Sequence, residues 1–209
     1  MADVLKSWKA GAKELRAKDP RLAPIIDRVG PPEIRFESNH FKALCESILS
    51  QQLATTAAAA ILNRFKDLSR PFPSPDYVRR CSVPRLRKVG ISGQKAAYLK
   101  ALSARWGESA WRRGWAKLDN EALVQRLVEV HGIGVWTAHM FLIFALGRTD
   151  VLPVGDYGVR RAIGLLMGLD DIPAPKALPE LVSHWKGQES IGSWYLWRAL
   201  DQKWFSNKN

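Results

Sequence analysis

The segment HGIGV, residues 131–135, places two glycines between two helical patterns, and it constrains the fold more than any other feature. Apolar residues recur at helical spacing over 120–130 before it and over 135–146 after it. A connection this short predicts that the two helices pack as a hairpin. Gly132 and Gly134 permit positive φ and close backbone approach, and the N–H groups that begin the second helix can bind a phosphate. Spacing alone also allows a purely structural role for both glycines.

The rest of the chain predicts helices as well. Alternating patterns typical of strands are almost absent, so we predict an all-α fold. Gly30-Pro31-Pro32 cannot continue a helix and is the expected crossing between two lobes. Ser38 or Asn39 is expected to cap a helix that the residues QQLATT, 51–56, interrupt. Further helices are expected at 4–19, 24–28, 84–89, 94–106, 157–167, 176–185 and 191–205.

The charge of the chain favours a polyanionic partner. Its 32 Lys and Arg residues exceed its 20 Asp and Glu residues, which leaves a net charge of +12. A charge needed only for solubility would be spread evenly, but no acidic residue stands between Asp76 and Glu108, a segment rich in Lys and Arg. Nucleic acid is therefore the favoured partner.

Cysteine content and hydropathy exclude several classes. With only Cys45 and Cys81, this chain alone forms neither a disulfide framework nor a four-cysteine metal or iron–sulfur site. A reducing compartment is the simplest interpretation. The N-terminus does not read as a secretion signal, and no stretch has the roughly 18 apolar residues of a membrane span. We expect an intracellular protein without membrane contact, in the cytoplasm or nucleoid, or in the nucleus of a eukaryote.

Four segments carry a family resemblance. VEVHGIGVWTAHMFLIFALGR resembles the helix-hairpin-helix of the DNA glycosylase (HhH-GPD) superfamily, and LPVGDYGVRRAIG resembles the segment with its catalytic aspartate, since Asp156 follows Gly134 by 22 residues. SILSQQLATTAAAAIL and VGISGQKAAYLKALSARW resemble two more family segments, and the likeness spans about residues 38–200. It implies two helical lobes with a cleft between them. The lobes are expected at 31–148, with the hairpin, and 149–209, with the aspartate, while residues 1–30 pack on the second.

Within this superfamily the chain is most similar to alkylpurine glycosylases of the DNA-3-methyladenine glycosylase II type. Trp136 stands where the branches that also cut the strand carry a lysine. The resemblance implies a monofunctional enzyme that hydrolyses the N-glycosidic bond of alkylated purines in duplex DNA during base excision repair. His131, Gly155 and Met140 depart from the residues usual in the family, so the resemblance does not fix the pocket shape that sets the lesion range.

The resemblance assigns the reaction to Asp156. A carboxylate below the sugar stabilises the positive charge that develops as the glycosidic bond stretches. Read without the family, Asp156 is an N-cap for the helix that follows, and the two roles are compatible. A flipped cationic base suits an aromatic wall, and the positions that match the family pocket are Trp136, Trp197 and Met140, with Trp194 beside them. Core packing is the better interpretation of Trp8, Trp106, Trp111 and Trp115.

The remaining assignments concern DNA and ions. Gln52 and Leu53 are the expected wedge, the residues that fill the space of the flipped nucleotide, although Leu53 also suits a core position. Main-chain carbonyls of Val128, Val130 and Gly132 are expected to hold a monovalent cation, Na⁺ or K⁺, and no other cofactor is required. The expected partner is double-stranded DNA with damaged bases, bound by a monomer. The other expected DNA-binding residues are Gly132, Ile133, Gly134, Val135, Thr137, Ser92 and Lys95.

Two alternative functions stay open. One is a helix-hairpin-helix module that binds DNA without chemistry. The other is a glycosylase for deaminated or oxidised bases. The residues do not rank the lesions, because the shape of the pocket decides that choice.

Overall fold

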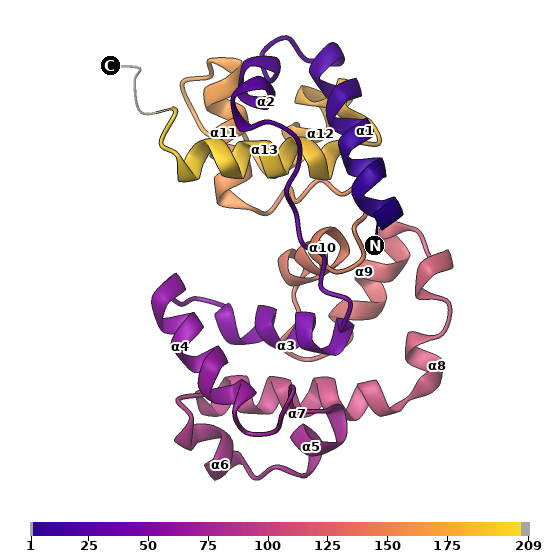
Figure 1. The fold of residues 1–209 in the computed structure, drawn as a ribbon, viewed down its shortest axis with the longest axis vertical. Helices are drawn as coiled ribbons and strands as arrows, with labels where there is room; N and C mark the ends of the chain where they lie inside the picture. The colour runs from indigo at the N-terminus through magenta and orange to yellow at the C-terminus, as the bar shows by residue number, and fades with distance from the viewer. Residues whose placement is uncertain (1, 206–209) are drawn as a thin grey trace. The chain divides into compact units, whose positions relative to one another are not determined.

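The computed structural model describes residues 2–205, apart from the side chains of Ala2 and Thr55. Over this range it contains helices and no strand (Figure 1), which confirms the predicted all-α class. The chain divides into two compact units. Unit 1 combines the described residues up to Phe36 with those from Leu142 onward, and unit 2 runs from Glu37 to Phe141. The chain therefore leaves unit 1 after Phe36, a few residues beyond the Gly-Pro-Pro segment.

Unit 1 is built around α13 (Glu189–Asp201). Ile191, Tyr195 and Leu196 of this helix are completely buried. Helices α1, α2 and α11 pack on it, so segments from both ends of the sequence form one core (Figure 1). The other elements of the unit have these bounds: α1 Ala2–Lys18, α2 Ala23–Val29, α11 Tyr157–Met167, η2 Pro175–Ala177, α12 Leu178–Leu181 and η3 Ser183–Trp185.

A buried carboxylate fixes the turn between α1 and α2. Asp19 is only 1% exposed, and its Oδ1 accepts hydrogen bonds from the N–H groups of Arg21 and Leu22. Its Oδ2 accepts a bond of 2.6 Å from the indole N–H of Trp185 and lies 2.9 Å from His184 Nε2. Burial raises the pKa of Asp19, but these hydrogen bonds outweigh it and hold the pKa below its ordinary value. Asp19 thereby joins the N-terminal helices to η3.

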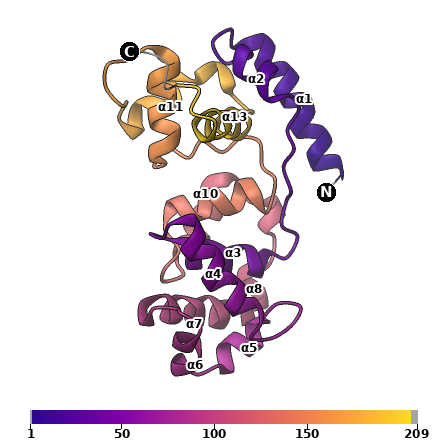
Figure 2. The ribbon, with the colours of Figure 1, turned by 60° about the vertical axis from the view of Figure 1, so that its left-hand side comes forward.

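Unit 2 has α7 at its centre. In Figure 2, α7 lies between α3 and the pair formed by α5 and α6, and all three helices contact it. Side chains of Asn39, Ser74, Ser82, Ser92 and Asp119 cap helices by accepting a backbone N–H three residues on. The elements have these bounds: α3 His40–Ser50, α4 Thr55–Lys66, α5 Pro75–Arg80, α6 Val83–Lys88, α7 Gly93–Gly107, α8 Ser109–Arg112, η1 Trp115–Lys117, α9 Asn120–Val128 and α10 Val135–Phe144. Residues 142–144, the end of α10, belong to unit 1.

Aromatic rings form much of the core of unit 2. Trp111 and Trp115 pack edge to face with centroids 5.0 Å apart, and Trp106 lies 5.8 Å from Trp115. Phe141 of α10 contacts Trp115 at 5.6 Å. Trp111 and Trp115 are 4% and 7% exposed, and Trp8 in unit 1 is fully buried. The predicted core role of these three tryptophans is confirmed.

One predicted helix is wrong. Residues 176–185 form η2, α12 and η3 instead of a single helix. Pro179 lacks the N–H that would continue a helix from Pro175, and it is tolerated here because it lies in the first turn of α12. Val182 then leaves the helical region, with φ −115° and ψ 27°. The short elements α8 and η1 were not predicted, and the last helix begins at Glu189 and ends at Asp201, a shorter and earlier span than 191–205.

In residues 2–205, every helix is too short or too polar to cross a bilayer.

Candidate functional site

The turn between α9 and α10 contains two glycines with different surroundings. Gly132 is crowded by neighbouring atoms, and Gly134 is not. Gly132 has φ +97°. A Cβ there would lie 2.1 Å from Cγ of Tyr98 and would clash with this side chain of α7. Ile133 is 3% exposed and anchors the turn in the core. Gly134 has no heavy atom within 4 Å of an added Cβ, and its carbonyl accepts the first bond of α10, from Ala138 N–H at 3.0 Å. Gly132 is therefore required by packing, whereas Gly134 lies at an accessible helix N-terminus.

The first turn of α10 presents apolar side chains to solvent. Val135 is 51% exposed and Trp136 is 41% exposed. Thr137, by contrast, is 2% exposed, and its Oγ1 accepts a hydrogen bond of 3.2 Å from Gln51 Nε2. The side chain of Thr137 therefore faces the interior of unit 2. Met140, one turn further along α10, is half-buried.

The segment 51–54, which we call the wedge turn, joins α3 to α4 and contains the two expected wedge residues. Gln52 is exposed and adopts φ +54°, which is uncommon for a residue with a side chain. Leu53 is 39% exposed, so it is not a core residue. A hollow of about 530 Å³ is lined by residues of the wedge turn together with Ser50 and Trp136. The expected wedge and one expected pocket tryptophan thus share one hollow of unit 2.

Ser92 and Lys95 lie at the start of α7. Ser92 is the N-cap, and its Oγ accepts from the Lys95 N–H at 3.2 Å. The Nζ of Lys95 donates to the carbonyls of Leu49 and Gln51, at 2.6 and 2.7 Å. Partial burial lowers the pKa of this ammonium group. Both bonds of Lys95 go to the backbone at the end of α3, a role that sequence reasoning missed.

In unit 1, two N–H donors orient the carboxylate of Asp156. As the N-cap of α11, its Oδ1 accepts from the Val159 N–H at 2.8 Å. The same Oδ1 accepts from the indole N–H of Trp197 at 3.1 Å. The predicted capping role is confirmed, and the carboxylate is half-buried. Gly158 leaves little room beside it, because a Cβ there would lie 3.1 Å from Asp156 Oδ1.

An aromatic pair adjoins this carboxylate. The rings of Trp197 and Phe144 lie 5.7 Å apart and are tilted by 34°. Trp194 of α13 is 8% exposed, and its ring packs against that of Tyr195 with centroids 5.0 Å apart. It therefore belongs to the core of unit 1. Sequence reasoning missed Phe144, because apolar residues occupy nearly every face of α10 and no periodicity singles out the one that pairs with Trp197.

The carbonyls expected to hold a cation lie around the hairpin. The Val130 carbonyl accepts from Ile133 N–H at 2.9 Å, and the Gly132 carbonyl accepts from Gln51 Nε2 at 2.9 Å. A carbonyl oxygen has two lone pairs, so these bonds are compatible with a cation ligand. In the described part of the chain, His, Cys, Asp and Glu do not gather in groups of three or more that could hold a metal.

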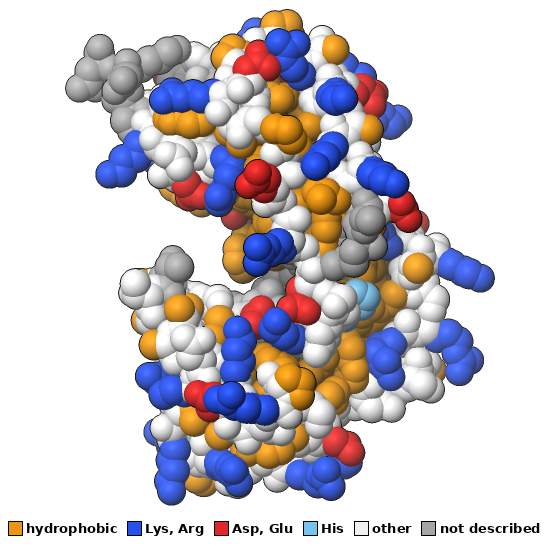
Figure 3. Space-filling model, viewed as in Figure 1, with side chains coloured by type: hydrophobic (Ala, Val, Ile, Leu, Met, Phe, Trp, Pro, Cys, Tyr) orange, Lys and Arg blue, Asp and Glu red, His pale blue; other side chains and the backbone are white. Residues whose placement is uncertain are grey.

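The basic segment between Asp76 and Glu108 includes most of α5 and all of α6 and α7. Arg79, Arg80, Arg85, Arg87 and Lys88 are exposed. Figure 3 shows Lys and Arg side chains on this part of unit 2. Arg79 forms a 3.0 Å ion pair with Asp76, and Lys100 donates to the carbonyl of Arg79. The segment is strongly basic but partly neutralised.

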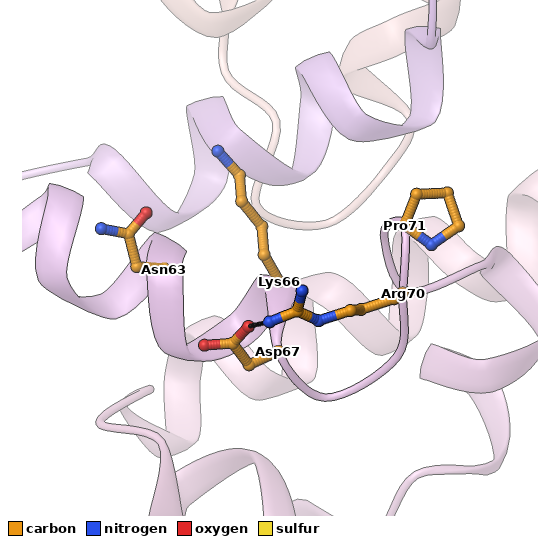
Figure 4. Close-up of a pocket in the computed structure, with 5 residues that line it drawn as sticks. All are labelled: Asn63, Lys66, Asp67, Arg70 and Pro71. Carbon is orange, nitrogen blue, oxygen red and sulfur yellow. Dashed lines mark hydrogen bonds and ion pairs between the residues drawn. The ribbon is translucent and has the colours of Figure 1, made fainter.

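A second hollow lies at the end of α4. It measures about 690 Å³ and is lined by Asn63, Lys66, Asp67, Arg70 and Pro71 (Figure 4). Arg70 and Asp67 form an ion pair of 3.0 Å, and Lys66 pairs with Glu46 of α3. The charged side chains of this hollow are thus held in ion pairs.

Comparison with known proteins gives consistent matches. The model of the HhH-GPD superfamily base excision DNA repair protein family matches residues 45–187. DNA-3-methyladenine glycosylase 1 of Schizosaccharomyces pombe is 32% identical over 183 residues, which cover 86% of this chain and 80% of that protein.

Solved structures agree with these sequence matches. The 3-methyladenine DNA glycosylase of S. pombe in complex with abasic DNA has a TM-score of 0.79 at 31% identity, covering 92% of this chain and 97% of that one. A DNA-3-methyladenine glycosidase from Bacillus halodurans has a TM-score of 0.78 at 32% identity, covering 90% and 88%. This chain therefore belongs to the HhH-GPD superfamily of base excision DNA repair proteins.

Proposed function

We propose that this protein is a monofunctional DNA glycosylase that hydrolyses the N-glycosidic bond of alkylated purines, of the 3-methyladenine kind, in duplex DNA. The first support is similarity, because relatives about 30% identical over most of the chain are named DNA-3-methyladenine glycosylases. The S. pombe structure is a complex with abasic DNA, the kind of product that base removal leaves. The proposed partner is accordingly damaged double-stranded DNA.

The observation that carries the proposal is the geometry at Asp156. Its Oδ1 is held by a backbone N–H and by the indole of Trp197. A preorganised carboxylate stabilises positive charge at a fixed place without reorganisation during the reaction. A simple surface N-cap would not need the second donor.

The proposed reaction is hydrolysis at C1′ of the flipped nucleotide. The bond between C1′ and the ring nitrogen breaks, and its electron pair leaves with the base. Positive charge develops on the sugar, and the carboxylate of Asp156 stabilises it more than it stabilises the ground state. Water then adds to C1′ and loses a proton, which leaves an abasic sugar. A purine alkylated on the ring is already cationic and departs as a neutral base, so little leaving-group protonation is required.

The aromatic residues suit this substrate. Trp136 is exposed at the start of α10, and Trp197 pairs with Phe144. Electron-rich rings attract a cationic base. Trp136 has no amine and cannot form the Schiff base that strand cleavage requires, so the product should be an intact strand with an abasic site.

DNA binding is proposed to use the hairpin and the wedge turn. The N-terminus of α10, with Gly134 exposed, suits a phosphate, and Gln52 with Leu53 would replace the flipped nucleotide. Carbonyls of Val128, Val130 and Gly132 would hold Na⁺ or K⁺ and so rigidify the hairpin. The cation site is tested by comparing DNA affinity in KCl and in tetramethylammonium chloride at equal ionic strength. Equal affinities in the two salts would remove the cation from the proposal. We further propose that the protein is a monomer and works where cellular DNA lies.

A lesion panel tests the proposed function. Duplexes carrying 3-methyladenine-type alkylation, hypoxanthine, uracil or 8-oxoguanine are incubated with the protein, and released base is measured. We expect release from alkylated DNA first. Release of base only from deaminated or oxidised duplexes would mean that these bases, and not alkylated purines, are the substrates. Binding without release from any duplex would favour a non-catalytic DNA-binding module.

A further inference from the structure

Lys95 ties the C-terminal end of α3 to α7. The last carbonyls of a helix have no partner within it, and a cation nearby is favourable. The Nζ of Lys95 donates both to the Leu49 carbonyl in that last turn and to the Gln51 carbonyl in the wedge turn. This half-buried ammonium therefore fixes where α3 ends and how the backbone leaves it.

Gln51 ties the same turn to the hairpin. Its Nε2 lies 2.9 Å from the Gly132 carbonyl and 3.2 Å from Oγ1 of the buried Thr137. These acceptors are 81 and 86 residues away in the sequence. One amide group thus joins the wedge turn to both sides of Gly134, where the phosphate is proposed to bind.

The conformation held by these bonds is an unfavourable one. Gln52, the residue that follows, has φ +54°. Residues with side chains persist in such conformations only where their surroundings over-determine them, and they cluster at functional sites. The bonds of Lys95 and Gln51 fix the backbone directly before Gln52.

We propose that Lys95 and Gln51 are positioning residues that hold the wedge turn against the hairpin, so that Gln52 and Leu53 are ready to replace a flipped nucleotide when the hairpin binds phosphate. This rests on the proposed function. Lys95 would act through the turn and not through contact with DNA, unlike the direct DNA-binding role expected from the sequence. Phosphate binding and wedge insertion then depend on one hydrogen-bonded assembly within unit 2.

The test separates damage binding from binding to undamaged DNA. Lys95→Met and Gln51→Met keep side-chain length and remove the donors. Arg64→Met is the matched control, because Arg64 Nε also donates to a backbone carbonyl in unit 2, that of Val89 at 2.8 Å. Affinity is measured for a duplex with a tetrahydrofuran abasic analogue and for the same duplex without it, alongside a thermal melt and single-turnover base release from methylated DNA.

We expect Lys95→Met and Gln51→Met to lower the preference for the abasic duplex, and the rate of base release, on the order of tenfold to a hundredfold, as misplacement of a positioned group does. Affinity for the undamaged duplex should change no more than it does in Arg64→Met. In Arg64→Met, the preference for the abasic duplex should equal that of the wild type. Because both residues hold one turn, the double variant should lose less than the sum of the single losses in free energy.

A folded variant that keeps the wild-type preference, or that loses affinity equally for both duplexes, would overturn the positioning role. If Lys95→Met melts far below the wild type, the affinity ratio of Gln51→Met decides the positioning role. Gln51→Met replaces a neutral side chain and leaves the charge of the protein unchanged. Failure of the wild type to release base would refute the proposed function instead, and the affinity ratio would still test the positioning of the wedge turn.

Discussion

At the residue scale, Asp19 shows what a buried charge requires in this fold. Its two oxygens accept hydrogen bonds from two backbone N–H groups and an indole, and its Oδ2 also lies within bonding distance of His184. A buried carboxylate without such partners would become protonated. Here the bonds favour the ionised form and connect the α1–α2 turn with η3.

This predicts that Asp19→Asn destabilises the protein at neutral pH. Asparagine offers only one acceptor oxygen, so at least one buried donor loses its partner, at a cost of about 1–3 kcal/mol. The pKa of Asp19 is lowered on folding, so its carboxylate contributes stability above the unfolded value near 3.9 and loses it as the pH falls through the folded value. Denaturant unfolding at pH 7 and below pH 4 checks both effects.

The control for this prediction is Asp170→Asn, since Asp170 is exposed. Its unfolding free energy should stay within about 0.5 kcal/mol of the wild type. A stability difference for Asp19→Asn that is absent at pH 7, or that grows as the pH falls, would contradict the assigned hydrogen bonds.

At the element scale, the two glycines of the hairpin differ in their surroundings. Gly132 combines positive φ with contact to Tyr98, so no larger residue fits. Gly134 has neither constraint, and it precedes a helix whose N-terminal N–H groups and dipole favour an anion.

Gly134→Asp should therefore weaken DNA binding without unfolding the protein. The added charge lies where a phosphate is proposed to bind, and a like charge there costs affinity, on the order of tenfold. Gly107→Asp is the control, because Gly107 is equally open but ends α7, at the C-terminal pole of a helix in the same unit. Fluorescence anisotropy with undamaged duplex measures the difference. Equal affinities of the two folded variants would mean that the duplex binds elsewhere.

The sequence predicted elements whose signals are local. Helix α11 begins and ends at the expected residues, because Asp156 caps it and Gly168 takes the left-handed conformation that ends it. Lys95 and Thr137 differ, because their roles depend on partners 44 to 86 residues away. Lys95 lies in a basic segment and was expected to contact DNA, and no local pattern distinguishes a lysine that binds carbonyls. The pairing of Phe144 with Trp197 is likewise a tertiary contact.

At the scale of the whole molecule, charge is the property most relevant to the proposed partner. The net charge is +12, and the exposed basic residues of α5 and α6 belong to the unit that carries the hairpin. Lys and Arg side chains that neutralise phosphates release counterions from DNA.

Affinity for undamaged duplex should therefore fall steeply with salt. Between about 50 and 200 mM salt, a protein that contacts several phosphates loses orders of magnitude in affinity. A titration series at fixed pH gives the slope of log affinity against log salt. A slope near zero would exclude a phosphate-dominated complex.

The reaction product is a second property of the whole enzyme. Because Trp136 cannot form a Schiff base, a methylated duplex should yield an intact strand that breaks only after heat or alkali. Denaturing gels of a single-turnover reaction, with and without alkali, check this. Substantial scission without alkali, or covalent trapping by borohydride, would contradict a monofunctional enzyme.

The most direct measurement is single-turnover base release by Asp156→Asn from methylated duplex, with enzyme in excess. Asparagine keeps the shape and an Oδ1 that accepts from Val159 and Trp197, so the melting temperature and DNA affinity should stay close to the wild type. The charge proposed to face the sugar is removed, and we expect the rate to fall roughly a hundredfold to a thousandfold, about 3–4 kcal/mol. A stable variant that releases base at the wild-type rate would mean that Asp156 only caps α11, and it would contradict the proposed catalytic role.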